Sequence, residues 1–274
     1  MPFERRPFQG LPGETDWVAM REILPAATAS VRFAAGHAPE GAPAEATVAT
    51  VLPMAWPGLH RADGTVFFAT QTGSSSGDAS RDLAGQLIAA AGAEPGAPLV
   101  TTPAPTVDTP RLQDLIDTSE PLQVTVHEGF DFWVGEQELE GEAKESLQRA
   151  NESVVPTVKM ASVPSAYWCR IGDRTHIRLV LPDEEDTATD ALARLLAAGT
   201  AGLGGETRLL GAFRACGLLV PVWDLDPELT AADYEDELAA FHKRYAVALA
   251  SSEPLTPEQR RARSGLLSRQ VTLR

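Results

Sequence analysis

The chain has 274 residues, of which 43% are hydrophobic and 22% are charged, so it can bury a sizeable core. Its formal net charge of −15 argues against a nucleic-acid-binding body, because phosphate contacts require a surface rich in Lys and Arg. No apolar run reaches the ~20 residues that a membrane-spanning helix needs, and the opening MPFERRPFQG has no apolar signal core. The sequence predicts a globular, cytoplasmic protein without membrane contact.

Metal and cofactor chemistry have little support in the sequence. The two cysteines, Cys169 and Cys216, are too few for a disulfide framework or a structural zinc site. The acidic run LPDEED lacks the spacing of a calcium loop, and negative charge there suits the start of the helix that should follow. No phosphate-binding loop or dinucleotide fingerprint is present. We therefore expect no metal site and no cofactor.

Two segments of the chain, residues 51–92 and 163–199, resemble each other. Each runs from a Pro-x-Ala-aromatic start through two strand-like stretches and a polar turn to a helix. Weaker similarity extends to the segments before and after both copies. The pattern predicts a tandem repeat.

Local signals in each copy favour a hairpin followed by a helix. The turns are RADGT and GDRT, since Gly accepts the positive φ that a tight hairpin needs. The expected helix caps are Asp78 and either Asp186 or Thr187 at the N-termini. Gly92 and Gly199 are the expected left-handed residues that end the two helices.

Further elements lie outside the two hairpins. A second hairpin should turn at Cys216-Gly217, and an exposed helix is expected over residues 137–151. Capping boxes predict helices that begin near Thr230 and Thr256. The predicted fold is α+β, with two tandem pseudo-repeats of mostly antiparallel strands, flanking helices and a helical C-terminal segment. The predicted domains are residues 1–136, 137–229 and 230–274, and one compact globule is the alternative.

A cluster of polar and aromatic residues after the first copy is the candidate catalytic site. The acid/base candidates are His127, Glu128 and Asp131, with Trp133 beside them as a candidate binding residue. Trp223 and Asp224 take the corresponding place in the second copy. If the copies pack about a pseudo-two-fold axis, these residues could meet at a cleft that binds a small molecule. The alternative is that the aromatic residues only close the edge of the core.

The second copy has a polar pair, His176 and Arg178, where the first copy has Val66 and Phe68. This asymmetry marks a candidate binding site unique to the second half. The alternative is a strand surface that faces solvent. Cys169, Asp173 and His176 also supply the residue types of a thiol triad, although the sequence does not show that they converge.

The C-terminal segment TPEQRRARSGLLSRQVTLR carries five Arg and one Glu on an otherwise acidic protein. Its candidate binding residues are Arg260, Arg261 and Arg263. The segment could dock on the protein's own body, contact a protein partner, or contact nucleic acid. Docking would depend on its leucines and on bidentate Arg contacts, because isolated surface ion pairs contribute only about 0–1 kcal/mol.

Several stretches, among them RPFQGLPGETDWVAMREILPAATA, ATVLPMAWPGLHRADGTVF, HEGFDFWV and GLLVPVWDL, resemble a family of uncharacterised actinobacterial proteins. The resemblance spans nearly the whole chain and implies no established activity and no catalytic residue. Some members carry topoisomerase or translocase labels. The sequence supports neither label. It has no Gly-Lys phosphate loop, and its three tyrosines lie in an expected strand and on the apolar stripe of an expected helix, whereas a topoisomerase needs a nucleophilic tyrosine in a basic surface.

The sequence favours a non-enzymatic binding or interaction scaffold, because no compact reaction motif is present. Two alternatives remain open. One is an enzyme that uses a cleft between the two repeats, and the other is nucleic-acid contact through the Arg-rich tail.

Overall fold

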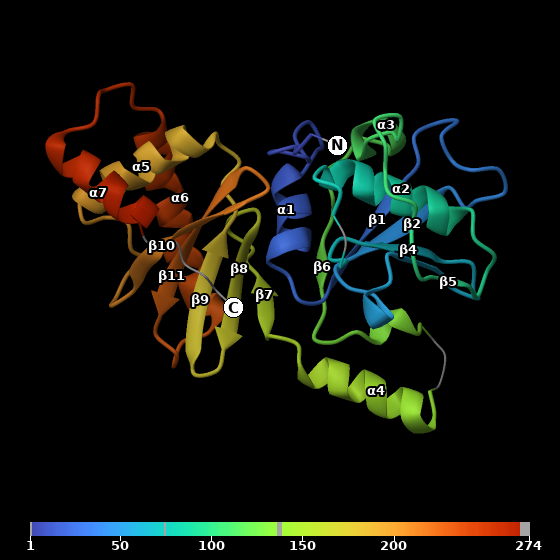
Figure 1. Ribbon diagram of the computed structural model, residues 1–274. Coiled ribbons are helices and arrows are strands. Elements are labelled where there is room, and N and C mark those ends of the chain that lie inside the picture. Colours follow the sequence, from blue (N-terminus) through green and yellow to red (C-terminus); the bar gives the residue numbers. More distant parts are fainter. Residues whose placement is uncertain (1, 74, 136–138, 269–274) are drawn as a thin grey trace. The chain divides into compact units, whose positions relative to one another are not determined.

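The computed structural model describes residues 2–73, 75–135 and 139–268, and it has an α+β fold. The chain divides into two compact units, residues 1–154 and 155–274. Each unit has its own β-sheet with helices packed against it (Figure 1). Within the described residues, no helix combines the length and the apolar character needed to cross a bilayer.

The boundary between the units differs from the expected domain limits at residues 136 and 229. Helix α4 (Gly141–Glu152) belongs to the first unit, because Asn151 near its end accepts a 2.7 Å hydrogen bond from the backbone N–H of Phe130. The C-terminal helices belong to the second unit, where they pack against another helix of that unit.

The first unit contains a six-stranded sheet in the order β5-β3-β4-β2-β1-β6. All neighbouring strands are antiparallel except β2 and β4, which are parallel. Helix α2 packs against β3 and β4. The elements besides α4 are α1 (Glu14–Glu22), β1 (Ala27–Arg32), β2 (Glu45–Ala49), η1 (Pro53–Ala55), β3 (Gly58–His60), β4 (Val66–Ala69), α2 (Ala79–Ala91), β5 (Pro98–Leu99), α3 (Leu112–Leu115), β6 (Thr125–Val126) and η2 (Asp131–Trp133).

Strand β1 forms because its side chains alternate between small apolar and polar types. Ala27, Ala29 and Val31 are buried, whereas Ser30 and Arg32 on the opposite face are exposed. A period of two places one set in the core and the other on a polar face of the sheet. This polar face borders the candidate site described below.

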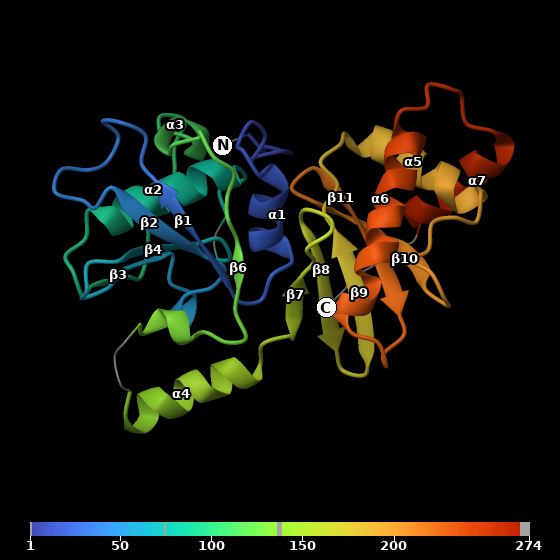
Figure 2. The same ribbon diagram turned by 180° about the vertical axis from the view of Figure 1, so that it is seen from behind.

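The second unit contains a five-stranded, fully antiparallel sheet in the order β10-β11-β9-β8-β7. Helices α5, α6 and α7 gather on one side of it (Figure 2), and their apolar faces share one core with Trp168, Ile177 and Trp223 of the strands. The elements are β7 (Thr157–Lys159), β8 (Ala166–Ile171), β9 (Arg174–Leu179), α5 (Glu185–Ala197), β10 (Arg208–Ala215), β11 (Leu218–Leu225), η3 (Ala231–Tyr234), α6 (Glu235–Leu249) and α7 (Pro257–Ser268).

Most of the predicted turns and caps are confirmed. The β10–β11 hairpin turns at Cys216 and Gly217, whose φ angles of 44° and 80° fit a turn with two left-handed residues. Asp78 caps α2 by accepting hydrogen bonds from the N–H groups of Ser80 and Arg81. The capping bonds at Thr230 and Thr256 are also formed.

Other local predictions are wrong or only partly right. Helix α5 begins at Glu185 and its N-cap is Glu184, so neither Asp186 nor Thr187 caps it. Gly199 has the expected left-handed φ of 71°, but Gly92 has a φ of −85°. The helix expected over 137–151 begins at Gly141, and residues 137 and 138 lie outside the described part of the chain.

The similarity between the two copies is limited to a hairpin and the helix after it, β3-β4-α2 in the first unit and β8-β9-α5 in the second. The flanking strands take different places. The second neighbour of β4 is the preceding strand β2, in parallel, whereas the second neighbour of β9 is the later strand β11, antiparallel.

Leu266 anchors α7 and is only 3% exposed. Replacing Leu266 with Ala should lower the free energy of unfolding by about 2 to 5 kcal/mol, because the truncation leaves a cavity in the shared core. Val247→Ala is the matched control, since Val247 on α6 is 76% exposed and its truncation should change stability by about 0.5 kcal/mol or less. Urea unfolding measures both, and equal effects of the two substitutions would contradict the docking of α7.

Candidate functional site

The first unit contains a pocket created by a mismatch in the pairing of β1. Thr28 pairs with Thr125 of β6, and four residues later the carbonyl of Arg32 accepts a 2.8 Å hydrogen bond from the N–H of Asp117. From Asp117 to Thr125 the opposing chain therefore takes eight residue steps, whereas β1 takes four from Thr28 to Arg32. The surplus bows away from the strand and leaves a cavity of about 570 Å³.

Ser30 lies in the middle of this opening. Along β1 the residues alternate between bonding toward β2 and bonding away from it. Ala27 and Phe33 form backbone hydrogen bonds on the β2 side of the strand. By this alternation the N–H and C=O groups of Ala29 and Val31 also point toward β2, and those of Ser30 point toward the opening. Within the described residues no backbone partner meets the N–H or C=O of Ser30. A ligand can therefore pair with this residue as a strand would.

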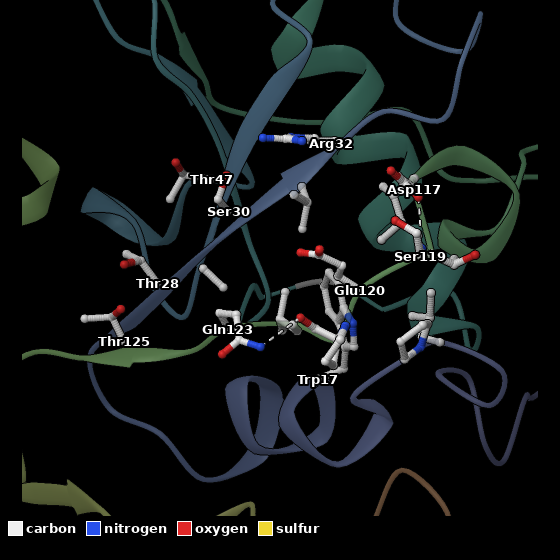
Figure 3. A pocket seen from close by; sticks show the side chains of 18 residues that line it. Trp17, Thr28, Ser30, Arg32, Thr47, Asp117, Ser119, Glu120, Gln123 and Thr125 are labelled. Atoms are coloured by element: carbon white, nitrogen blue, oxygen red, sulfur yellow. Dashed lines mark hydrogen bonds between the residues drawn. The ribbon is translucent and has the colours of Figure 1, made fainter.

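The walls of the pocket combine an aromatic side with hydroxyl groups (Figure 3). Trp17 of α1 is 1% exposed and stacks on Phe8 with ring centroids 6.0 Å apart, yet its indole N–H has no hydrogen-bond partner among the described residues. The hydroxyl-bearing residues of the lining are Thr28, Ser30, Thr47, Thr118, Ser119 and Thr125. The lining offers several donors and acceptors around one apolar surface.

The electrostatic character of the pocket is acidic. Asp117 and Glu120 lie on its bowed wall, and Figure 3 shows the Glu120 side chain reaching into the opening. The N–H and the hydroxyl of Ser119 donate to Asp117 and hold its pKa below the usual value. Arg32, the cation of the lining, is paired with Glu45 at 2.7 Å. The first unit as a whole has 22 Asp and Glu against nine Lys and Arg, a net charge of −13.

The structure connects one sequence-predicted residue, His127, to this pocket. Its Nε2 lies 2.7 Å from the hydroxyl oxygen of Thr28, which lines the opening. Burial lowers the pKa of His127, so the ring favours its neutral form. His127 also contacts the ring of Phe132, with centroids 5.0 Å apart. It is the member of the predicted acid/base cluster that the structure links to the pocket lining.

Glu128 and Asp131 are not joined to His127. Glu128 is exposed, and Asp131 faces Asn151 of α4 at 3.4 Å. No hydrogen bond or ion pair connects His127, Glu128 and Asp131 to one another within the described residues.

Trp133 has a structural place in the first unit. It stacks on Phe130 with ring centroids 4.4 Å apart, and its indole N–H donates to the carbonyl of Val51 at 2.8 Å. Trp133 therefore packs, partly buried, against a small core cluster of the first unit.

The predicted residues of the second unit fall on two faces of its sheet. Trp223 is fully buried, donates to the carbonyl of Ala201 at 2.7 Å and packs edge-on against Phe241. It is a core residue. His176 and Asp224 lie together on the other face, with Nδ1 and Oδ1 3.7 Å apart.

The polar pair of β9 does not form a solvent-facing surface, since His176 is only 4% exposed. The Nε of Arg178 is also buried and has no hydrogen-bond partner among the described atoms. Cys169 stands opposite His176 in the sheet, but burial raises the pKa of its thiol, and Asp173 lies at the exposed turn. The carboxylate beside His176 is therefore that of the half-buried Asp224 rather than that of Asp173, and the triad of residue types does not carry an activated thiolate.

The arginines of the tail make internal contacts. Arg263 binds Asp190 at 2.6 Å and Asp186 at 2.7 Å, both on α5. Arg261 pairs with Glu258 of its own helix at 3.1 Å, and Arg260 donates to the carbonyl of Leu255. These contacts support docking of α7 on the second unit. Val271 and Leu273, the last apolar points of the tail, lie outside the described residues.

Metal binding has no assembled candidate in residues 2–73, 75–135 and 139–268, where no three His, Cys, Asp or Glu side chains are placed to hold an ion. The acidic residues 184–186 begin helix α5, and Glu185 and Asp186 pair with arginines, which accounts for their clustering.

The pocket of the first unit was not predicted from the sequence. The signal that could have found it is the alternation of ATASVR, which predicts a strand with one polar face, together with the turn-rich segment DTSEPLQ. Their pairing, about ninety positions apart in the chain, cannot be read from local pattern.

The chain belongs to a family of unknown function, DUF5926, whose family model matches residues 7–274. Comparison with curated proteins and with solved structures gives no match.

His176 should make the stability of the protein depend on pH. Burial lowers its pKa in the folded state, and this outweighs the Trp223 carbonyl and Asp224, which favour the charged ring. In the unfolded chain the ring takes up a proton near pH 6.5. As the pH falls through this region the unfolded state gains a proton that the folded state resists, so stability decreases.

Urea unfolding between pH 7.5 and pH 5.5 at constant ionic strength tests this prediction. The substitution His176→Asn removes the titrating group, and the loss of stability on acidification should become shallower than in the unmodified protein. An unchanged slope would show that His176 binds its proton equally in both states.

Proposed function

We propose that this member of the DUF5926 family acts by binding rather than by catalysis, and that the pocket beside β1 receives a small polar ligand. The observation that carries the proposal is the open backbone position at Ser30. A strand residue whose N–H and C=O face a cavity needs hydrogen-bond partners from water or from a ligand. The lining also contains hydroxyl groups and the Trp17 indole, which are polar groups of the kind that small-molecule sites use.

The charge of the first unit supports the same proposal. With a net charge of −13, this unit repels phosphate-rich polymers and attracts cations. Arg263 of the tail is held by two carboxylates of α5, which favours a structural role over contact with a nucleic acid.

A second candidate function, catalysis at the same pocket, rests on the Thr28–His127 pair. A hydroxyl at 2.7 Å from a neutral imidazole is the arrangement in which a general base activates a nucleophile. Against this role, the described residues place no carboxylate on the ring to orient it, and the ring instead contacts that of Phe132.

Screening the full chain by NMR against a library of small polar fragments tests the proposal. Hits should shift the amide signals of Ser30, Ser119 and Thr125, and Glu120→Lys should abolish or reverse the preference for cationic fragments. Glu142→Lys on α4 is the matched control, because Glu142 is exposed and outside the pocket lining. If no fragment shifts these amides, the binding function is wrong, and if bound esters or amides are hydrolysed in the same samples, catalysis by Thr28 and His127 replaces it.

A further inference from the structure

We infer that the ligand of the β1 pocket is a small cation that carries an amide group, about the size of one basic amino-acyl unit. The inference rests on the proposed binding function and specifies the chemistry that the pocket recognises. Three properties of the opening lead to it: the backbone groups of Ser30, the closed ends of the gap, and the carboxylates of the bowed wall.

The amide follows from the geometry of antiparallel pairing. In an antiparallel ladder, a residue whose N–H and C=O point toward the neighbouring strand forms two hydrogen bonds with a single residue of that strand. One bond uses its N–H and the other uses its C=O. Ser30 presents both groups to the same gap, with no backbone partner within the described residues. A ligand that satisfies both needs an acceptor and a donor spaced as in one amino-acyl residue.

The size follows from the two closed ends. The gap is bounded on one side by the Thr28–Thr125 pair and on the other by the hydrogen bond between Asp117 and Arg32. Thr28 and Arg32 are four residue steps apart on β1, which corresponds to roughly 14 Å at about 3.4 Å per step. A peptide running along the strand would meet both closures, so the cavity of about 570 Å³ admits a short molecule and excludes a through-running chain.

The positive charge follows from the lining. Glu120 reaches into the opening in Figure 3 and makes no ion pair within the described residues, while Arg32 is already paired with Glu45. Asp117 adds a second carboxylate on the same wall. A cation on the ligand would meet Glu120, and the surrounding unit would draw it toward the pocket.

Trp17 is an independent indication that the pocket is built for a polar molecule. It is 99% buried, it lines the cavity, and its indole N–H has no partner in the described part of the chain. The indole nitrogen itself keeps access to the cavity, since it is not among the fully buried side-chain atoms that lack a partner in the described residues. A second carbonyl of the ligand, such as the one of an acyl group, would accept a hydrogen bond from it.

Three probes separate the parts of the inference: Nα-acetyl-arginine amide, the neutral Nα-acetyl-glutamine amide, and agmatine, which has the cation without an amide. Each is titrated into the full chain, and the amide signals of Ser30 and Thr125 are followed by NMR. We expect acetyl-arginine amide to bind most tightly. Glu120→Gln should weaken its binding about three- to fivefold, the range of an exposed ion pair, and leave acetyl-glutamine amide unchanged. Glu142→Gln should change neither.

The outcomes distinguish this inference from the proposed function. Equal binding of acetyl-arginine amide and acetyl-glutamine amide overturns the cationic part, and equal binding of agmatine overturns the amide part. If none of the three probes shifts the Ser30 amide while other polar fragments do, the ligand class is wrong and the binding function stands. If neither probes nor fragments shift it, both are wrong.

Discussion

Strand β1 is paired along its whole length with β2 but only at its two ends on the other side. The chain that returns along its free side has four residues more than the strand it must follow, and hydrogen bonds at both ends fix the surplus in place. This constraint produces the cavity, the unpaired backbone of Ser30 and the approach of His127 to Thr28. The functional proposals for the first unit therefore depend on one register shift.

The second unit shows the contrast. Its five strands pair without a comparable opening between neighbours, apart from one irregularity at residues 209–211. Two of its arginines make internal ion pairs, since Arg214 pairs with Glu185 and Arg263 binds two further carboxylates of α5. The second unit has a net charge of only −2, so the acidity of the protein is concentrated in the first unit, where the open pocket lies.

Local chemistry made part of the fold predictable. The hairpins at Asp63-Gly64 and Cys216-Gly217 and the cap at Asp78 follow from residues within a few positions of one another. The first turn of α5 was misplaced because Glu184, a weaker capping residue, takes the N-cap two positions before the better-suited Asp186. The parallel contact of β2 with β4 was missed because it joins strands that are not adjacent in the chain.

The candidate site was only partly predictable. His127 stood out as a titratable residue after a strand, and in the structure its Nε2 lies 2.7 Å from the hydroxyl oxygen of Thr28, which lines the pocket. Glu128 and Asp131, which were expected beside His127, form no hydrogen bond or ion pair with its ring within the described residues. Glu128 is exposed to solvent, and Asp131 lies at the start of η2, where it faces Asn151. Ser30 and Glu120 have no sequence signature of their own, because their importance comes from pairing between segments far apart in the chain.

The central claim is that the N–H and C=O of Ser30, on the side of β1 away from β2, have no backbone hydrogen-bond partner within the described residues, and amide hydrogen exchange of the full chain measures this directly for the N–H. The N–H of Ser30 should exchange much faster than those of Ala29 and Val31, which bond to β2, although all three lie in one strand. Equal protection of the three amides would show that β1 is paired on both sides at Ser30 and that the pocket is closed.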